Sequence, residues 1–327
     1  MIKSKAHTPQ LTIGLPVYNG EKYLGEALDC LLGQSFADFE IIICDNASTD
    51  GTSAICAAYL RRDPRIRYRR GERNVGATAN FRLAFESGKA PLFKWAAHYD
   101  LYHPHYLAAC VDILRRNPDV VLAHSATAFI DDAGQMFPFD PATGQFRDPI
   151  TGEQQTPDAP SIGDTAEPAF RFWQVLSRAR WGSHIFGVIR REALERTQLL
   201  ANFASGDRAT LAELALIGRF QATNERFYLK RFHKSGSWVL SQDELKSFLG
   251  AEKNYSRRRR QLAGFFSAPF NKPVSLATKA VCTLMVAVHC GRILVHMARG
   301  KDARYAAQGR LWRRSVDSPM SAKGRVQ

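Results

Sequence analysis

The fold is decided by two stretches near the start of the chain, which read LTIGLPVYNG over residues 11–20 and FEIIICDNASTDGT over residues 39–52. Each begins as an apolar run typical of a buried parallel strand and ends in polar residues and glycine. A segment with apolar residues at helical spacing lies between them. In an open parallel sheet, ligands bind beyond the carboxyl ends of the strands. We therefore expect Asn19, Asp45 and Asp50 to line half of a ligand pocket.

The alternation of apolar runs and helical patterns continues along most of the chain, and it includes long apolar strands expected at residues 120–130 and 220–232. It predicts an α/β fold with a mainly parallel, Rossmann-like sheet and helices on both faces. Residues 137–166 break the pattern, because they are rich in Pro, Gly, Asp and Thr without periodicity, so we expect a long loop or lid there. Neither a G-x-G-x-x-G nor a Walker A motif occurs, which argues against a dinucleotide enzyme or a P-loop NTPase.

The positive charge is concentrated near the end of the chain. The net charge is +14, and residues 251–327 hold 16 Lys+Arg against 3 Asp+Glu, whereas residues 1–250 are nearly neutral. Residues 274–298 are apolar with a narrow polar stripe, and the uncharged run of 12 residues between Lys279 and Arg292 is too short to cross a membrane. The pattern predicts an interfacial amphipathic helix on an anionic membrane surface. It does not favour nucleic acid, because no recognition motif accompanies the charge.

The cysteines and the N-terminus indicate the compartment. Six cysteines occur without a Cys-x-x-Cys pair, and three of them lie in strand or helical patterns, so reduced core thiols are expected. Reduced thiols fit a cytosolic location. Residues 1–10 lack the apolar core of a signal peptide. We expect a cytoplasmic protein, peripheral on the inner face of the cell membrane.

The two strand-end motifs also carry a resemblance. PVYN at residues 16–19 and DNASTDGT at residues 45–52 resemble, in order and spacing, the opening of a family 2 glycosyltransferase with the A-type fold. The resemblance extends to about Pro141 and resumes from about Trp181 to His233. It implies a catalytic domain over residues 1–250, comprising a nucleotide-sugar-binding half (1–135), a loop or lid (136–166) and an acceptor half (167–250), followed by a basic, amphipathic helical tail (251–327).

The resemblance assigns the donor, a nucleotide-diphospho-sugar, to the strand ends. Asp45 matches the residue that contacts the base, although within its Asp-Asn-Ala-Ser run it is also a good turn-former. Tyr18 is expected to face the base or ribose, and Tyr99 the ribose. The expected donor-binding residues are Pro16, Tyr18, Asn19, Asp45, Arg73, Asn74, Gly76, Tyr99 and Asp100.

The family places an Asp-rich metal-binding triplet after the fourth strand, where this chain reads His98-Tyr99-Asp100. Because residues two apart in an extended chain share a face, we expect His98 and Asp100 to hold one ion. His98 is equally readable as an ordinary strand-end residue. His233 is the expected third ligand and Arg231 a diphosphate contact. A divalent cation, Mn²⁺ or Mg²⁺, is the implied cofactor, and the missing carboxylates leave open whether it is needed.

Asp207 begins an apolar helical pattern in the acceptor half. A helix start favours an ionised carboxylate, so we expect a low pKa, and alone the residue reads as a helix cap. The resemblance makes Asp207 the catalytic base that deprotonates the acceptor hydroxyl. Trp181 and His184 match the segment that lines the acceptor pocket. Trp181 is equally suited to stacking on a sugar and to packing in the core.

The implied function is the inverting transfer of a sugar to a hydroxyl of a glycan or lipid-linked acceptor, in surface polysaccharide or glycolipid synthesis. The missing carboxylates at positions 98 and 99 keep an alternative open, a non-catalytic relative that binds a nucleotide or sugar as a membrane-associated partner. A nucleotidyltransferase ranks last, because it needs a glycine-rich loop bearing Lys or Arg after the first strand. The sequence makes no prediction of the oligomeric state.

Overall fold

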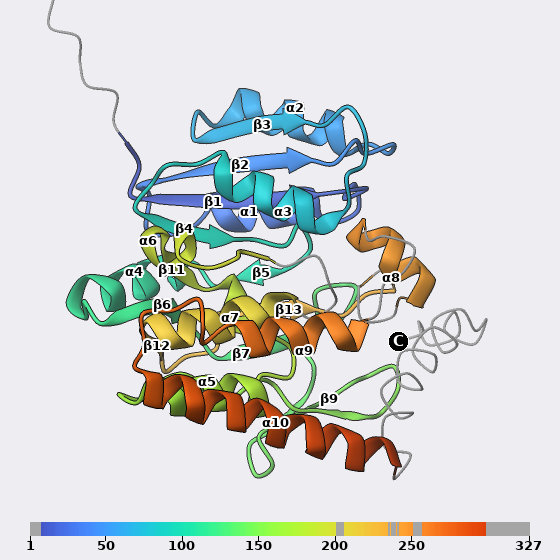
Figure 1. Ribbon diagram of the computed structural model, residues 1–327. Coiled ribbons are helices and arrows are strands. Elements are labelled where there is room, and N and C mark those ends of the chain that lie inside the picture. Colours follow the sequence, from blue (N-terminus) through green and yellow to red (C-terminus); the bar gives the residue numbers. More distant parts are fainter. Residues whose placement is uncertain are drawn as a thin grey trace, which may run out of the picture.

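The computed structural model describes residues 8–200, 206–234, 236, 240, 242–250 and 257–298. Within this part, a seven-stranded sheet lies between two layers of helices, and two three-stranded sheets lie beside it (Figure 1). The strand order in the large sheet is β12-β6-β11-β4-β1-β2-β3. This is the α/β architecture that the sequence predicts.

The parallel half of the sheet brings the two strand-end motifs together. Its strands are β1 (Leu11–Val17), β2 (Phe39–Asp45), β3 (Ile66–Arg70) and β4 (Leu92–Trp95), which all run parallel to one another. Val17 is opposite Asp45 in the register of β1 and β2. The residues that follow the two strands therefore lie at the same edge of the sheet. The other half contains β6 (Val120–His124), β11 (Val188–Arg190) and β12 (Arg219–Ala222), with β11 antiparallel to both neighbours.

Two separate apolar cores cover the two faces of the sheet. One is formed with α1 (Leu24–Leu32), α2 (Thr52–Arg62) and α4 (Tyr106–Arg116). The other is formed with α3 (Ala77–Glu86), α5 (Pro168–Arg178), α6 (Arg191–Glu195) and α7 (Gly206–Ile217). The inner strands β1, β2, β4 and β6 are buried on both sides, which explains the continuous apolar runs in the sequence.

The two long strands expected at residues 120–130 and 220–232 are each divided in the structure. The chain leaves the central sheet after β6 and β12 and enters a small sheet, ordered β5-β13-β7, that contains β5 (Leu101–Tyr102), β7 (Thr127–Ile130) and β13 (Tyr228–Arg231). The prediction was wrong because both pieces are buried, so hydropathy alone does not show the change of sheet. This small sheet carries much of the candidate site.

The expected loop at residues 137–166 contains a small antiparallel sheet of β8 (Phe139–Asp140), β9 (Gln145–Arg147) and β10 (Gln154–Gln155). Its turns are held by aspartate side chains: Asp140 Oδ1 accepts from Ala142 N (2.9 Å), and Asp148 Oδ1 accepts from Ile150 N (2.8 Å). The prediction missed these strands because they are too short to show a period.

The C-terminal helices are packed onto the α/β body. They are α8 (Gln242–Leu249), α9 (Arg257–Ser267) and α10 (Leu276–Ala298), and α10 lies alongside α5 (Figure 1). Phe265, Cys282 and Val286 are buried in the same core as α5 and α7. In the described part, no helix combines the length and apolar character needed to cross a bilayer. Residues 251–256 and 299–327 of the expected tail lie outside the described residues. All six cysteines are free thiols, as expected.

Candidate functional site

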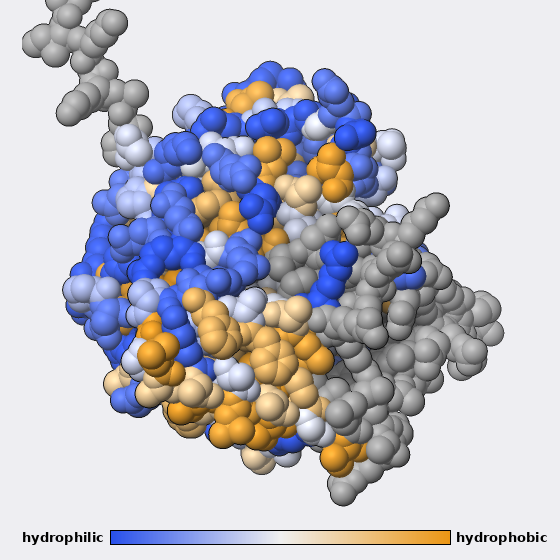
Figure 2. All heavy atoms as spheres, viewed as in Figure 1, coloured by the Kyte–Doolittle hydropathy of each residue, from blue (hydrophilic) through white to orange (hydrophobic). Residues whose placement is uncertain are grey.

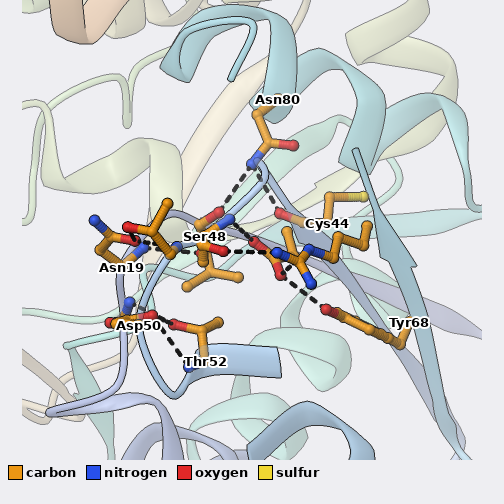
Figure 3. Close-up of polar contacts among 12 residues, drawn as sticks. Asn19, Cys44, Ser48, Asp50, Thr52, Tyr68 and Asn80 are labelled. Carbon is orange, nitrogen blue, oxygen red and sulfur yellow. Dashed lines mark hydrogen bonds and ion pairs between the residues drawn. The ribbon is translucent and has the colours of Figure 1, made fainter. Parts of the chain in front are cut away.

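The loops after β1 and β2 are fastened to each other by side-chain hydrogen bonds (Figure 3). Asn19 N donates to Ser48 Oγ (2.9 Å), and Asn19 Oδ1 accepts from Thr49 N (2.9 Å). Asn19 adopts a left-handed backbone conformation with φ of 51°, which asparagine tolerates better than most residues. The carboxylate of Asp50 accepts from Glu21 N (3.0 Å), which adds a second link. The structure thus brings both predicted strand ends into one site.

Asp45 is buried, and its carboxylate stabilises the loop that follows β2. Its Oδ1 accepts from Ser48 N (2.8 Å), and its Oδ2 accepts from the Tyr68 hydroxyl (2.8 Å) (Figure 3). Arg70 Nε lies 3.8 Å from Oδ2, and an Arg70 amino group donates to Ser48 O (2.8 Å). Sequence reasoning named neither Tyr68 nor Arg70. The expected base contact of Asp45 stays a prediction.

Asn80 is a further site residue that the sequence analysis missed. Its buried Nδ2 donates to Cys44 O (2.8 Å) and lies 3.5 Å from Val17 O, so one side chain joins the ends of β1 and β2 (Figure 3). The signal in the sequence was an asparagine on the inward face of an otherwise apolar helix pattern, because buried amides are normally hydrogen-bonded.

The third predicted donor element lies beside these loops. Asn46 Nδ2 donates to Asn74 Oδ1 (2.8 Å), which also accepts from Gly76 N (2.8 Å). The side chains of Arg73 and Asn74 are exposed, and Tyr18 is 43% exposed. The expected donor-binding residues Tyr18, Arg73 and Asn74 are therefore accessible from solvent, whereas Pro16 is buried within β1.

His98-Tyr99-Asp100 does not present its ends on one face, as an extended chain would. Residues 98 and 99 form a turn. The Tyr99 ring packs against both histidines, with its centre 4.9 Å from that of the His98 ring and 4.4 Å from that of the His233 ring. Burial lowers the pKa of His98 to about 4 and that of His233 to about 3. The extended backbone on which the prediction of a shared face rested is therefore absent at these residues.

Asp100 is fully buried and engaged by the small sheet. Its Oδ2 accepts from the Tyr228 hydroxyl (2.5 Å), and its Oδ1 accepts from Arg231 N (2.8 Å). Burial raises the pKa of Asp100, and the positive charge of Lys230 opposes that rise. The carboxylate therefore fixes β13 beside β5 and does not face solvent.

Arg231 is buried, and its side chain is already engaged by other parts of the protein. Its guanidinium donates to Glu26 Oε2 (2.6 Å), Tyr99 O (2.7 Å) and Asp132 O (3.0 Å), and it is almost fully buried. Glu26 lies on α1, so Arg231 ties the small sheet to that helix. The expected diphosphate contact of Arg231 does not agree with this placement.

The residues present do not fit a divalent cation. Such an ion needs several oxygen or imidazole ligands converging on one point. Among the described residues, no group of three His, Cys, Asp or Glu side chains converges in this way. The one carboxylate left in the triplet already accepts hydrogen bonds at both oxygens.

Asp207 lies in the first turn of α7, partly exposed, against the turn formed by Gly182. Gly182 has a left-handed conformation with φ of 63°, and a Cβ added there would lie 2.5 Å from Asp207 Oδ2. Asp207 Oδ1 also accepts from Arg208 N (2.8 Å). The glycine therefore leaves room for the carboxylate.

The expected low pKa of Asp207 was wrong. Burial raises the pKa above its ordinary value, while Arg208 and Lys230 oppose the rise and Asp158 adds to it. Loss of water around the carboxylate outweighs the helix N-terminus. A raised pKa makes a carboxylate a stronger base, which suits proton abstraction from a hydroxyl.

Asp158 organises the turn that contacts Asp207. Its buried carboxylate accepts from the main-chain N–H groups of Arg180 (2.6 Å), Trp181 (2.9 Å) and Ser183 (3.0 Å). Sequence reasoning missed Asp158, because it lies in the segment expected to be a lid. His184 is buried, with its Nδ1 3.7 Å from Asp158 Oδ2, and its expected place in the acceptor pocket stays a prediction. Trp181 is partly buried and packs on Phe129 and Phe232.

Comparison with known proteins shows which class of protein this chain is similar to. Residues 12–165 match the model of the family Glycosyl transferase family 2. An uncharacterized glycosyltransferase of Rickettsia typhi is 32% identical over 123 residues, which is 37% of each chain. The glycosyltransferase GlyG of Streptococcus pneumoniae is 23% identical over 237 residues, or 72% of this chain and 74% of GlyG. Residues 12–165 are thus similar to the family 2 glycosyltransferases, and the match spans little more than a third of the Rickettsia relative.

Solved structures show the same fold. Residues 1–349 of Staphylococcus aureus TarS, in complex with UDP-GlcNAc, superpose with a TM-score of 0.55 at 13% identity, covering 88% of this chain and 73% of that one. The mannosyltransferase PcManGT of Pyrobaculum calidifontis, in complex with GDP-Man and Mn²⁺, gives 0.51 at 14% identity, covering 97% and 89%. The A-type glycosyltransferase fold expected from the strand-end motifs is confirmed.

Proposed function

We propose that this protein is an inverting glycosyltransferase, which moves a sugar from a nucleotide diphosphate to a hydroxyl group with Asp207 as the general base. The acceptor hydroxyl loses its proton to Asp207 and attacks the anomeric carbon. The bond from that carbon to the diphosphate oxygen breaks, and its electron pair leaves with the diphosphate. One displacement of this kind inverts the configuration.

The single observation that carries the proposal is the setting of Asp207. A carboxylate with a raised pKa, given space by Gly182, lies in the first turn of α7, where the resemblance to family 2 leads us to expect the base. It is partly exposed, so an acceptor reaches it. A module that only binds sugar has no need of such a base.

The donor is proposed to lie over the loops after β1 and β2, against Tyr18, Asn19, Arg73 and Asn74. Two proteins with this fold bind UDP-GlcNAc and GDP-Man respectively, which supports a nucleotide-diphospho-sugar here. The proposed acceptor is a glycan or a lipid-linked sugar, and we propose that the partly buried Trp181 contacts it.

The test uses purified protein with UDP-glucose, UDP-GlcNAc and GDP-mannose, and measures release of the nucleoside diphosphate with and without simple sugar acceptors. We expect one donor to be turned over, and Asp207→Asn to lower the rate by about 10²- to 10⁴-fold. The variant should still be stabilised against heat by the same nucleotide. Equal rates for the two proteins would contradict the role of Asp207.

A second candidate is a non-catalytic relative that binds nucleotide or sugar. The observation that favours it is the full burial of Asp100 within a triplet that has lost two carboxylates. This candidate predicts thermal stabilisation by a nucleotide without turnover of any donor, so the same experiment separates the two.

We also propose a peripheral position on an anionic membrane for the part that includes α10. The helix exposes Leu276, Val281, Leu284, Val288 and Val295, and Leu284 is 66% exposed. Figure 2 shows apolar side chains gathered over the lower part of the molecule, where α10 and α5 lie. The basic composition of residues 251–327 supports an anionic leaflet as the surface.

A further inference from the structure

We propose that the Lys230 ammonium, in place of a divalent cation, neutralises the diphosphate that leaves during sugar transfer. The inference rests on the proposed function, since it concerns the leaving group of that reaction. If Lys230 takes this role, the enzyme needs no metal ion. This agrees with the altered triplet, which reads His98-Tyr99-Asp100 in this chain.

The need for another cation follows from the state of the triplet. Asp100 is the only carboxylate left there, and both of its oxygens accept hydrogen bonds from β13. Freeing it for an ion would leave the Tyr228 hydroxyl without its acceptor in the core, and a buried unpaired polar group is costly. The described residues offer no other convergent set of ligands. A departing diphosphate nevertheless carries charge that must be offset.

Lys230 and Arg231, the two cationic residues of β13, lie on opposite faces of the strand. Side chains two apart in a strand share a face, so Lys230 lies with Tyr228 and opposite to Arg231. The Arg231 guanidinium is occupied by Glu26 and two main-chain carbonyls. Lys230 Nζ lies 5.9 Å from the centre of the Phe186 ring, and among the described residues no carboxylate is within ion-pair distance of it. Lys230 is thus the cation of β13 that is available to a ligand.

The charge of Lys230 reaches both halves of the site. It opposes the rise in pKa of Asp100 on the donor side and of Asp207 on the acceptor side, and it lowers the pKa of His233. Phe186, under the ammonium, ends η1 (Ser183–Phe186), the short helix that follows Gly182 beside Asp207. The proposal places this one ammonium between the donor end and the base, close to the bond that breaks.

The chemistry balances without a metal. The proton moves from the acceptor hydroxyl to Asp207, the new bond forms at the anomeric carbon, and the electron pair of the broken bond goes to the diphosphate. Lys230 neither gains nor loses a proton in this step. It stabilises the negative charge that develops on the diphosphate oxygens, as a compact point charge does.

The experiment measures binding of UDP, UMP, GDP and GMP by calorimetry, in EDTA and in Mn²⁺, to the full-length wild type and variants. In the wild type we expect binding of one nucleoside diphosphate in EDTA, with a Kd within about 3-fold of that in Mn²⁺. Lys230→Met should weaken the binding of that diphosphate by about 10- to 100-fold, because a charge-assisted contact is lost. Binding of the matching monophosphate should weaken much less. Lys230→Arg should keep part of the preference for the diphosphate over the monophosphate, because it retains a positive charge.

The matched control is Lys89→Met, since Lys89 is exposed and precedes β4 at the opposite edge of the sheet. It should bind as the wild type does. Diphosphate binding that requires Mn²⁺ and is unchanged in Lys230→Met would overturn the inference and leave the proposed function intact. A wild type that binds none of the four nucleotides under either condition would overturn the proposed function itself, and the inference with it.

Discussion

Gly182 is the residue on which the position of the proposed base depends most directly. Its left-handed backbone is held by the hydrogen bonds that Asp158 accepts from residues 180, 181 and 183. A side chain there would be strained and would also meet Asp207. Backbone strain and steric contact are separable effects, because the chain has other left-handed glycines in open space.

We expect Gly182→Ala to lower kcat by at least about 10-fold, because moving a catalytic group by about 1 Å is that damaging or more. Nucleotide binding should change little. Gly144→Ala is the matched control, since Gly144 has φ of 68° and nothing within 4 Å of an added Cβ. Both variants should lose about 1 kcal/mol of stability to strain. Rates that fall equally in both would show that strain alone is responsible.

Lys94 is a buried cation within the β4 strand. It contacts Phe186 O and lies over the Tyr102 ring, 3.9 Å from its centre. Burial lowers its pKa to about 7 from an ordinary value of 10.5. Between these values the unfolded chain binds more protons than the folded one, so this group makes stability rise as pH increases through that window.

We therefore expect Lys94→Met to be at least as stable as the wild type at pH about 7. Its advantage should shrink towards pH about 9.5, by up to about 1.4 kcal/mol per pH unit. Phe186 O keeps the hydrogen bond from the Tyr106 hydroxyl (2.9 Å), so the carbonyl is not left unsatisfied. Urea unfolding at the two pH values measures the difference. An advantage that is constant or grows with pH would contradict the burial argument, and the exposed Lys89→Met should show neither effect.

Among individual residues, the sequence analysis could name as site candidates those that lie next to recognisable turns or helix starts. Asn19, Asp45 and Asp207 follow strand ends or begin a helix, where local chemistry marks them. Lys230 was missed, because three neighbouring side chains, Lys230, Arg231 and Lys234, are alike in sequence and only the sheet decides which one faces the site. The pKa of Asp207 was wrong, because burial depends on residues distant in the chain.

Among the elements, α7 is joined to the C-terminal segment by a buried ion pair. Lys272 Nζ lies 2.9 Å from Glu213 Oε2, and both side chains are under 5% exposed. Glu213 also accepts from Gln198 N (2.8 Å), and Lys272 contacts Arg196 O. The pair thus joins α7, the segment after α6 and the turn before α10.

We expect Lys272→Met to destabilise the protein by about 3–5 kcal/mol, because Glu213 is left buried without its partner. The double variant Lys272→Met/Glu213→Gln should recover part of that loss, since the amide keeps an acceptor for Gln198 N. The exposed pair Arg116–Asp112, at 3.0 Å, is the control, and Arg116→Met should change stability by less than about 1 kcal/mol. Chemical denaturation measures all three. A small loss in the single variant would mean that the C-terminal segment is only loosely docked.

Periodicity predicted the helices α5 and α7 and the parallel strands well, because each buries one regular face. It failed where short strands change sheet, at β7 and β13, since hydropathy is the same in both sheets. The three strands within residues 139–155 could not be predicted either, because strands of two or three residues are too short to show a hydrophobic period.

On the whole molecule, the proposed membrane position makes a clear prediction. Wild-type protein should sediment with vesicles that contain phosphatidylserine and much less with phosphatidylcholine alone. Leu284→Glu should reduce that binding by about 10-fold, because an exposed leucine that enters the interface contributes about 1.5–3 kcal/mol. Leu60→Glu, at a 45% exposed leucine on α2, is the control and should bind as the wild type does. Absence of wild-type binding to anionic vesicles would remove the membrane from the proposal.

The packing of α9 and α10 on α5 and α7 has a consequence for the order in which the protein is made. A chain that has grown to residue 250 contains every strand of the sheet and the helix that bears Asp207. It lacks Phe265, Cys282 and Val286, which complete the core under that helix. Since synthesis runs from the N-terminus, the sheet has all its parts while this core still exposes apolar surface to the ribosome and to chaperones. The acceptor half therefore reaches its final packing only when the C-terminal helices have emerged.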